Sequence, residues 1–202
     1  MADGARIRPA REEEAAAVAA LLHETAVDMY ERFAGHRESA LRTLEAAFRR
    51  SGTGASREVV RVVDAGGAIA AAMAAFPAGE VNRRGSRFLR LLLARTPPWT
   101  WVRSIRLHRL GGRLAPPPPA DSLYVDALAV AEEHRRRGLA RMLLADAERS
   151  ARELGLASVA LETGLGNAAA RALYESAGFE EGERREPRDG LPGFVAYVKP
   201  VR

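Results

Sequence analysis

The sequence predicts a single domain, residues 1–202, of the α/β (α+β) class, with helices flanking one β-sheet. A chain of 202 residues that is 47% hydrophobic has enough apolar material for one ordinary core. Helical periodicity dominates the first fifty residues, and two apolar segments around a tight turn follow. From residue 121 onward strand and helix patterns alternate, which implies a right-handed crossover between two parallel strands.

The first part of the chain predicts a strand, a helical region and a hairpin. The first helix places Ala17, Val18, Leu21 and Leu22 on one face. The hairpin is predicted because two β-type segments flank the turn Ala65–Gly67. The predicted elements are a strand at Ala5–Pro9, a helix at Glu12–Thr25, a second helical region with apolar positions over Val27–Phe33 and Glu38–Arg49, and strands at Val59–Asp64 and Ala68–Phe76.

Residues 80–119 predict a helical insertion rich in arginine. Phe88, Leu91 and Leu92, and then Trp101 and Ile105, recur at roughly helical spacing, so the favoured interpretation is the solvated face of one or two amphipathic helices. A lid that steers an anionic ligand is an alternative, and a nucleic-acid or membrane surface is another. Proline residues 116–119 close the insertion as a stiff, extended connector. The arginines are Arg83, Arg84, Arg87, Arg90, Arg95, Arg103, Arg106, Arg109 and Arg113.

The last part of the chain predicts strand, helix, strand, short helix and two final strands. The long helix should turn Leu139, Met142, Leu143, Ala147 and Leu154 inward. Asn167 is a good N-cap for the short helix, and Gly178 is a good C-terminal stop. The predicted elements are Ser122–Val130, Arg137–Leu154, Ala157–Glu162, Asn167–Ser176, Glu180–Arg185 and Phe194–Pro200.

Composition excludes several classes of chemistry. The chain has no cysteine, so disulfides and thiolate nucleophiles are excluded, and its four histidines lack metal-ligand spacing. We therefore expect no metal. Apolar runs are too short for a membrane span, and Glu12, Glu13 and Glu14 do not resemble the start of a signal peptide, so a soluble cytoplasmic protein without membrane contact is expected. The net charge of +5 permits nucleic-acid binding, but such binding also needs a concentrated basic face with aromatic residues for stacking, and nucleic acid is not the expected partner.

An anion-binding loop is predicted between the strand that ends near Val130 and the following helix. The segment Arg135-x-x-Gly138-x-Ala140 leads directly into the helix. Gly138 lacks a Cβ, so the backbone can approach a ligand closely, and the free N–H groups of the first helical turn point at it. A pyrophosphate suits such a site.

Two linked motifs resemble the GNAT acetyltransferase superfamily. The first is Arg135-x-x-Gly138-x-Ala140, and the second is Asn167 followed by Leu173-Tyr174 and Gly178-Phe179. The resemblance is specific over residues 123–181 and looser before them. It implies a GNAT-like mixed, mostly antiparallel sheet that splays open beside the strand ending near Val130. It also implies acetyl-CoA as co-substrate.

The resemblance further implies roles for individual residues. The strand backbone before the loop would hold the pantetheine arm and polarise the thioester carbonyl, and the loop would bind the pyrophosphate. Asn167 would contact the cofactor, with Arg171 and Tyr174 on the same helix face. Tyr174 would give a proton or hydrogen bond to the departing sulfur. The implied cofactor-binding residues are Leu128, Ala129, Val130, Arg135, Arg136, Arg137, Gly138, Leu139, Ala140, Asn167 and Arg171.

A general base is also needed, and Asp126 is the first candidate because some GNAT enzymes have a glutamate at this position. In a regular strand Asp126 shares a side with Leu128 and Val130, although a bulge would alter this. An aspartate needs burial, or a bound water, to act on an ammonium group. Glu162 is a second candidate, and a purely structural role for Asp126 stays open. His134, beside three arginines, should face solvent.

The predicted function is direct transfer of an acetyl group from acetyl-CoA to a primary amine of a small molecule or peptide, in a ternary complex. Tyr30, Arg83 and the segment Trp99–Trp101 are guesses for the acceptor pocket. A non-catalytic acyl-CoA-binding or sensing module is the main alternative, and an arginine-rich nucleic-acid-binding protein is a distant third. The sequence does not decide whether the chain forms a homodimer.

Overall fold

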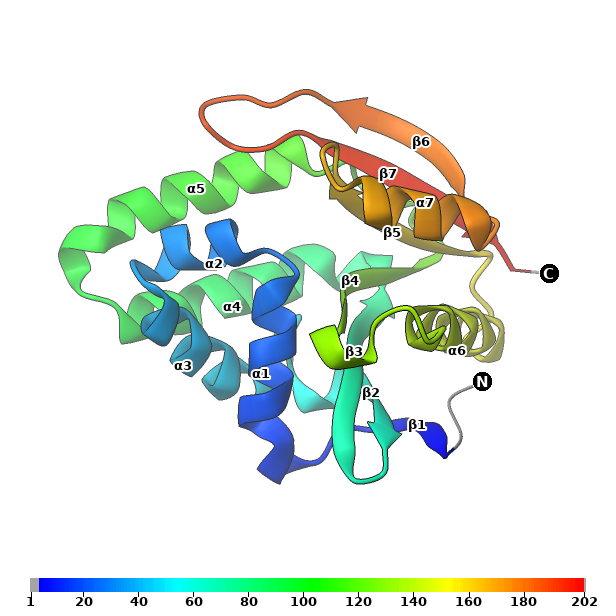
Figure 1. The fold of residues 1–202 in the computed structure, drawn as a ribbon. Coiled ribbons are helices and arrows are strands. Elements are labelled where there is room, and N and C mark those ends of the chain that lie inside the picture. The colour runs from blue at the N-terminus through cyan, green and yellow to red at the C-terminus, as the bar shows by residue number, and fades with distance from the viewer. Residues whose placement is uncertain (1–3, 202) are drawn as a thin grey trace.

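The computed structural model, which describes residues 4–201, is built around a seven-stranded sheet of order β1-β2-β3-β4-β5-β7-β6 (Figure 1). Only β4 and β5 pair in parallel, and every other neighbouring pair is antiparallel. The predicted mixed, mostly antiparallel sheet and the crossover are thus confirmed. The strands are β1 Ala5–Pro9, β2 Val60–Ala65, β3 Ala68–Pro77, β4 Ser122–Val130, β5 Ser158–Gly164, β6 Glu180–Arg185 and β7 Phe194–Pro200.

Helices cover both faces of the sheet and form two cores. On one face the apolar side of α6 packs on β3, β4 and β5 through Leu139, Leu143 and Leu144. On the other face α1 and α3 pack on β2, β3 and β4 through residues such as Leu22 and Phe48. The helices are α1 Ala15–Glu24, α2 Val27–Ala34, α3 Arg37–Phe48, α4 Val81–Arg95, α5 Trp101–Leu114, α6 Leu139–Glu153 and α7 Ala168–Ser176.

Small residues in β3 let the helices on both faces approach the sheet. Ala71 and Met73 face the α6 core, whereas Ala72 and Ala74 face the α1 core, and all four are buried. This alternation is the pattern of a central strand that is covered on both faces.

The arginine-rich insertion folds as the helix pair α4 and α5, as its helical spacing predicts, while the role of its exposed arginines stays a prediction. Helix α4 contacts α3 and α5, and α5 also contacts α2, so the insertion extends the helical layer on the α1 face (Figure 1). Leu91 and Leu92 of α4 are buried. The proline connector then leads back to β4 across the face of β5, β7 and β6, where it lines a small cavity of about 130 Å³.

Several predicted details were wrong at the ends of helices. Helix α6 begins at Leu139 rather than Arg137, because Arg136 and Gly138 have positive φ angles of 61° and 82°. Leu154, predicted to point inward, is 58% exposed because it is the C-terminal cap of α6. Ala17 is exposed as well, since Ala15 and Val18 occupy the buried face of α1.

None of the helices within residues 4–201 combines the length and the apolar character that a membrane span requires.

Candidate active site

The sheet opens between β4 and β5, at a bulge in β4. Ala74 pairs with Ala127 and Ala75 with Val125, so Asp126 is the extra residue in β4. The parallel pairing of β4 with β5 ends at Val125, opposite Leu161, although both strands continue beyond this point. The strands therefore separate as expected, and the backbone of Leu128, Ala129 and Val130 has no β-strand partner on the β5 side.

The bulge turns Asp126 away from Leu128 and Val130. Leu128 and Val130 pack on the α6 core with Val125, whereas Ala127 and Ala129 belong to the α1 core. Asp126 lies on the α1 side, where a Cβ on Gly54 would come within 2.8 Å of its Oδ2. The prediction for a regular strand, that Asp126 shares a side with Leu128 and Val130, was wrong because the extra residue reverses the alternation.

The carboxylate of Asp126 is suited to accept a proton. It forms no ion pair or hydrogen bond with any residue between 4 and 201, and solvent reaches its side chain. The surrounding protein nevertheless restricts hydration of the carboxylate, and this desolvation raises the pKa of Asp126 to about 6. The positive charge of Arg84 has the opposite but smaller effect on this pKa. The raised pKa that a catalytic aspartate needs is thus present, although the side chain is exposed and not buried.

Glu162 lies across the opening from Asp126, on β5. It is half-buried and accepts a hydrogen bond from the Tyr124 hydroxyl, with 2.7 Å between Oη and Oε1. Desolvation, together with the negative charge of Asp126, raises the pKa of Glu162 to about 7, although the Tyr124 hydrogen bond favours the charged form. The opening therefore has two carboxylates, Asp126 and Glu162, whose pKa values are raised chiefly by desolvation.

Tyr174 reaches the same opening from α7. Its ring is buried and lies 5.6 Å from the ring of Tyr197 and 6.1 Å from that of Phe179, centroid to centroid. Burial, followed by the charge of Glu162, raises the pKa of Tyr174 to about 12. Among residues 4–201, none forms a hydrogen bond with its hydroxyl, which is therefore protonated at neutral pH and free to donate.

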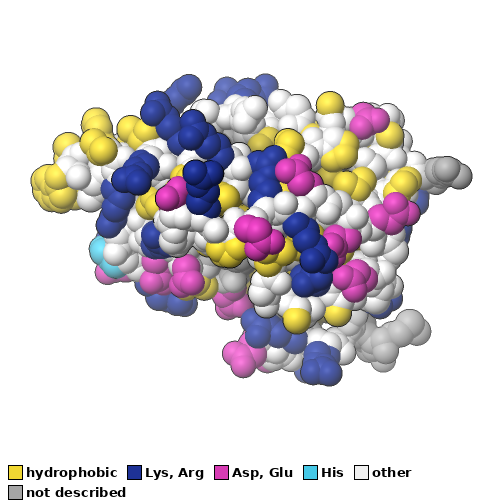
Figure 2. All heavy atoms as spheres, turned by 90° about the horizontal axis from the view of Figure 1, so that it is seen from above, with side chains coloured by type: hydrophobic (Ala, Val, Ile, Leu, Met, Phe, Trp, Pro, Cys, Tyr) yellow, Lys and Arg dark blue, Asp and Glu magenta, His cyan; other side chains and the backbone are white. Residues whose placement is uncertain are grey.

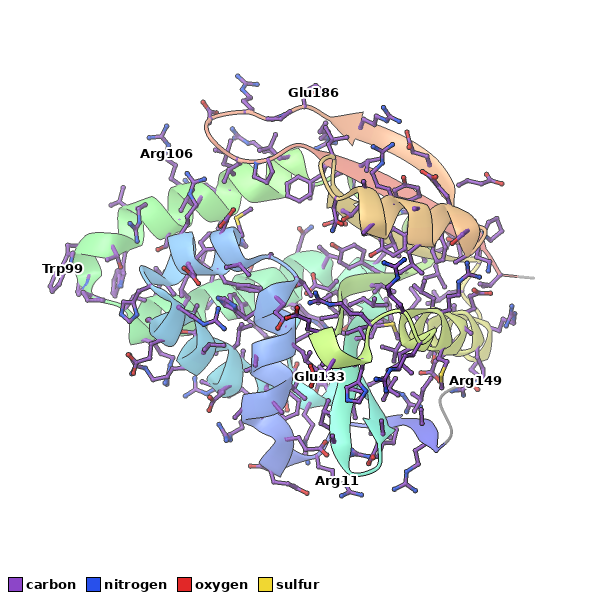
Figure 3. All side chains as sticks on the ribbon, in the orientation of Figure 1. Arg11, Trp99, Arg106, Glu133, Arg149 and Glu186 are labelled. Atoms are coloured by element: carbon purple, nitrogen blue, oxygen red, sulfur yellow. The ribbon has the colours of Figure 1, made fainter. Side chains whose placement is uncertain are left out.

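The loop that precedes α6 has the shape of an anion cradle. Residues 132–134, where Figure 3 labels Glu133, form one short turn, and the backbone then passes through Arg136 and Gly138 in left-handed conformations. Nothing lies within 4 Å of the position that a Cβ on Gly138 would occupy. The N–H groups of Leu139 and Ala140 belong to the first turn of α6 and have no intrahelical partner. The loop thus leaves open space beside free donors, where an anion can bind.

Side chains around the cradle fix its position. Arg135 donates from Nε to the Val130 carbonyl at 3.1 Å and from Nη2 to Glu24 Oε2 at 3.0 Å, which ties the loop to β4 and α1. Arg141 donates to Ser176 Oγ at 2.8 Å and so links α6 to α7 across the opening. Arg136 and Arg137 are exposed beside the cradle.

The remaining two predicted cofactor residues already have partners within the protein. Asn167 caps α7, since its Oδ1 accepts a hydrogen bond from the Ala170 N–H at 3.1 Å. Arg171 donates to the Tyr197 hydroxyl and to Glu181 Oε2, both at 3.3 Å. Contact of either residue with the cofactor stays a prediction.

Sequence reasoning missed three residues around Asp126 and Glu162, namely Tyr124, Gly54 and Arg84. Arg84 is buried, contacts the carboxylates of Glu58 and Glu80, and lies 5.1 Å from the centroid of the Phe76 ring. Its neighbour Arg83, which was guessed instead, pairs with Glu80 and is exposed. Tyr30, also guessed, does lie close enough for the charge of Asp126 to raise its pKa, although burial is the larger cause.

The sequence of this region matches a known family. The profile of the Acetyltransferase (GNAT) family matches residues 101–179, from α5 through β4, the cradle and β5 to the end of α7. Residues 101–179 thus carry the sequence pattern of the GNAT acetyltransferase family, which supports an acyltransferase enzyme.

Solved structures of acetyltransferases share the fold of the whole chain. An N-acetyltransferase from Staphylococcus aureus Mu50 has a TM-score of 0.76 at 19% identity, over 96% of this chain and 100% of that one. The ribosomal-protein-S18-alanine N-acetyltransferase from Escherichia coli has a TM-score of 0.58 at 17% identity, over 98% and 94%. An acetyltransferase from Bacillus subtilis in complex with CoA has a TM-score of 0.55 at 12% identity, over 98% of both chains. No curated protein matches the sequence.

Proposed function

We propose that the protein is an N-acetyltransferase that moves the acetyl group of acetyl-CoA directly to a primary amine. The observation that carries the proposal is the opening between β4 and β5. On its edges lie two carboxylates with raised pKa values, those of Asp126 and Glu162. The protonated hydroxyl of Tyr174 reaches the same opening from α7.

The cradle suits the pyrophosphate of acetyl-CoA. Gly138 leaves room for the phosphates, the first-turn N–H groups of Leu139 and Ala140 face them, and the exposed Arg136 and Arg137 add positive charge. The pantetheine arm would then run along the unpaired backbone of Leu128–Val130, which would also polarise the thioester carbonyl. The related acetyltransferase from Bacillus subtilis was solved with CoA, and this supports the assignment.

The side chains supply the proton transfers that amide formation needs. Asp126 or Glu162, or a water held by them, takes a proton from the ammonium group of the acceptor. The amine nitrogen then forms a bond to the acetyl carbon, the carbon–sulfur bond breaks, and Tyr174 gives its proton to the departing sulfur. The second proton leaves the nitrogen to the same carboxylates or to solvent, and solvent restores the proton of Tyr174.

The raised pKa values favour catalysis over the alternative of a non-catalytic acyl-CoA sensor. A sensor needs the cradle but gains nothing from two desolvated carboxylates beside it, since these destabilise the fold at neutral pH. The carboxylates thus mark the opening as a reaction site.

The test is release of free thiol from acetyl-CoA in the presence of amines, including peptides with a free N-terminus. Wild-type protein should show turnover that depends on the amine, and Tyr174→Phe should lose turnover while still binding acetyl-CoA. Binding without turnover by the wild type, across both peptide and small-molecule amines, would refute the enzyme proposal in favour of the sensor.

A further inference from the structure

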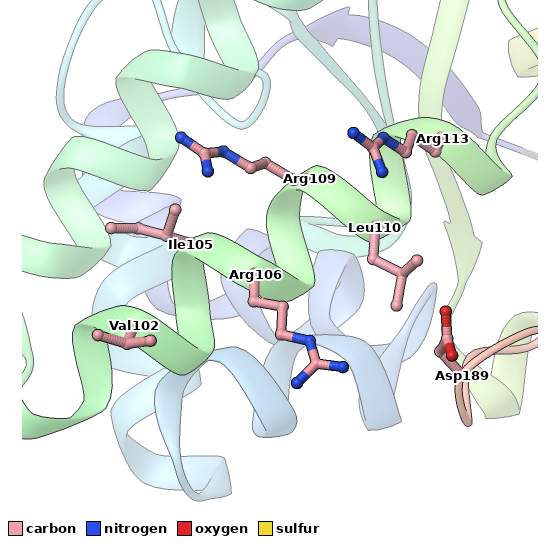
Figure 4. A pocket seen from close by; sticks show the side chains of 7 residues that line it. All are labelled: Val102, Ile105, Arg106, Arg109, Leu110, Arg113 and Asp189. Atoms are coloured by element: carbon pink, nitrogen blue, oxygen red, sulfur yellow. The ribbon is translucent and has the colours of Figure 1, made fainter.

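Helix α5 carries a second stripe of side chains that points away from the core. Ser104 and Leu114 are buried on its inner side. The outer stripe recurs at the spacing of one helix face and lines a groove of about 650 Å³, which Asp189 of the β6–β7 loop closes on one side (Figure 4). Its members are Val102, Ile105, Arg106, Arg109, Leu110 and Arg113.

One apolar member of this groove, Val102, is highly exposed, and Ile105 and Leu110 are partly exposed. Val102 is 79% exposed, and Trp99, just before the helix, is 82% exposed. Figure 2 shows this apolar surface at one end of the molecule, beside a band of arginine side chains. Exposed apolar side chains that follow a helical stripe indicate a surface that contacts another molecule.

The arginines of the groove lack acidic partners. Within residues 4–201, the side chains of Arg106, Arg109 and Arg113 form no ion pair, whereas Arg83 and Arg84 at the start of the insertion pair with Glu80. Asp189 lies 3.7 Å from the guanidinium of Arg188, measured from Oδ2 to Nε. The groove thus presents three positive charges that a ligand with carboxylates would complement.

Helix α2 joins the groove to the surroundings of Asp126. Tyr30 of α2 is close to Asp126, and Arg32 of the same helix donates to the Gly190 carbonyl at 2.5 Å, beside Asp189. Arg185, at the end of β6, donates to the carbonyls of Arg113 and Ala115 and so ties the loop to α5. Helix α2 and the β6–β7 loop therefore connect the groove to the cleft that contains Asp126.

We propose that this groove binds an acidic polypeptide segment with interspersed apolar residues, and that the segment belongs to the acetyl acceptor. The assignment as acceptor rests on the proposed function, whereas the binding itself does not. A polypeptide suits the groove better than a nucleic acid, because phosphates gain nothing from Val102, Ile105 and Leu110, whereas apolar side chains of a peptide do. A concave groove also fits a chain better than a flat membrane surface.

The size of the groove sets the length of the segment. From Val102 to Arg113 the helix axis rises by about 17 Å at 1.5 Å per residue. An extended peptide covers this distance with about five residues at roughly 3.3 Å each. Alternating glutamate and leucine within that length would present carboxylates to the arginines and apolar groups to the floor.

Fluorescence anisotropy with a labelled Glu-Leu repeat peptide tests the binding. The groove variant is Arg106→Glu/Arg109→Glu/Arg113→Glu, and the control is Arg37→Glu/Arg50→Glu/Arg57→Glu, which reverses three equally exposed arginines outside the groove. One exposed ion pair changes affinity by up to about fivefold, so the groove variant, which reverses three charges, should bind about tenfold to 100-fold more weakly. The control should stay within about threefold, because distant charges are screened.

Two further probes define the outcomes. The same peptide with glutamine for glutamate should bind weakly to the wild type, and equal binding of both peptides would overturn the proposal. An equal loss of peptide affinity in the groove and control variants would also overturn the proposal. So would a groove variant that still binds the peptide but no longer binds oligodeoxythymidylate or phosphatidylserine vesicles.

The role as acceptor site is tested separately with an acidic peptide as substrate. The groove variant should raise KM for this peptide at least about tenfold and leave kcat and acetyl-CoA affinity unchanged. If the protein acetylates amines but the groove variant has the same KM for the acidic peptide as the wild type, only the acceptor assignment is overturned. Absence of all turnover would instead count against the proposed function, since the anisotropy experiment needs no acetyl-CoA.

Discussion

Replacing Glu162 with glutamine should make the protein more stable at alkaline pH and less active. The substitution removes a charge from the opening between β4 and β5 but keeps the size of the side chain. A glutamine Oε1 can still accept the hydrogen bond from Tyr124. Any change in the free energy of unfolding therefore reports on the cost of the charge.

The magnitude follows from the raised pKa. The carboxyl of Glu162 titrates at about 7 in the folded protein and at its ordinary 4.5 in the unfolded chain. At 1.36 kcal/mol per pH unit this difference corresponds to about 3 kcal/mol. Because the side chain is partly exposed, solvent screening reduces the expected gain to about 1–2 kcal/mol.

The sign and the pH window are also fixed. Between pH 4.5 and 7 the folded state holds a proton that the unfolded chain has released, so wild-type stability falls as the pH rises. Below this window both states are neutral, and the variant gains nothing from losing the charge.

Urea denaturation of wild type and Glu162→Gln at several pH values measures this difference. The stability of the variant relative to wild type should increase from about pH 4.5 to above pH 7. Glu180→Gln, at an exposed glutamate of β6, serves as a control that should show no such trend. A difference between Glu162→Gln and wild type that does not depend on pH would refute the claim that Glu162 is desolvated.

Three other predictions concern catalysis and the core. The kcat/KM should fall below an apparent pKa between about 6 and 7, since protonated Asp126 and Glu162 cannot accept a proton, and a flat pH profile would contradict this. Tyr174→Phe should lower kcat about 100-fold with little change in acetyl-CoA affinity measured by calorimetry; loss of affinity instead would indicate a packing role. Leu143→Ala should lower the free energy of unfolding in urea denaturation by about 2–5 kcal/mol because Leu143, on the inner side of α6, is fully buried.

The strands and helices could be predicted where their apolar period is continuous and their ends carry turn signals. β4, β6 and β7 have the predicted bounds, and α7 begins after its Asn167 cap as expected. Predictions of burial failed at helix ends, where a shift of one residue in the helix boundary decides whether a side chain is buried or exposed. Leu154 fits the apolar period of α6 but follows its last turn, so the helix no longer holds it against the sheet.

The candidate site could be predicted only as far as its sequence motifs extend. Gly138 and Tyr174 were found because short motifs contain them. The bulge at Asp126 depends on pairing between β3 and β4, which are separated by the whole insertion, so local sequence cannot reveal it. For the same reason the hydrogen bond from Tyr124 to Glu162 and the proximity of Gly54 to Asp126 emerge only in three dimensions.

The most direct test of the central claim is a calorimetric titration of the protein with acetyl-CoA. Wild type should bind saturably, and Gly138→Glu should lose this binding because its side chain would fill the open space of the cradle. Gly66→Glu is the matched control, since Gly66 in the β2–β3 turn also has a positive φ, 68°, and open space around it. This control should bind like wild type. Absence of binding by folded wild-type protein, or equal binding by Gly138→Glu, would contradict the assignment of the cradle.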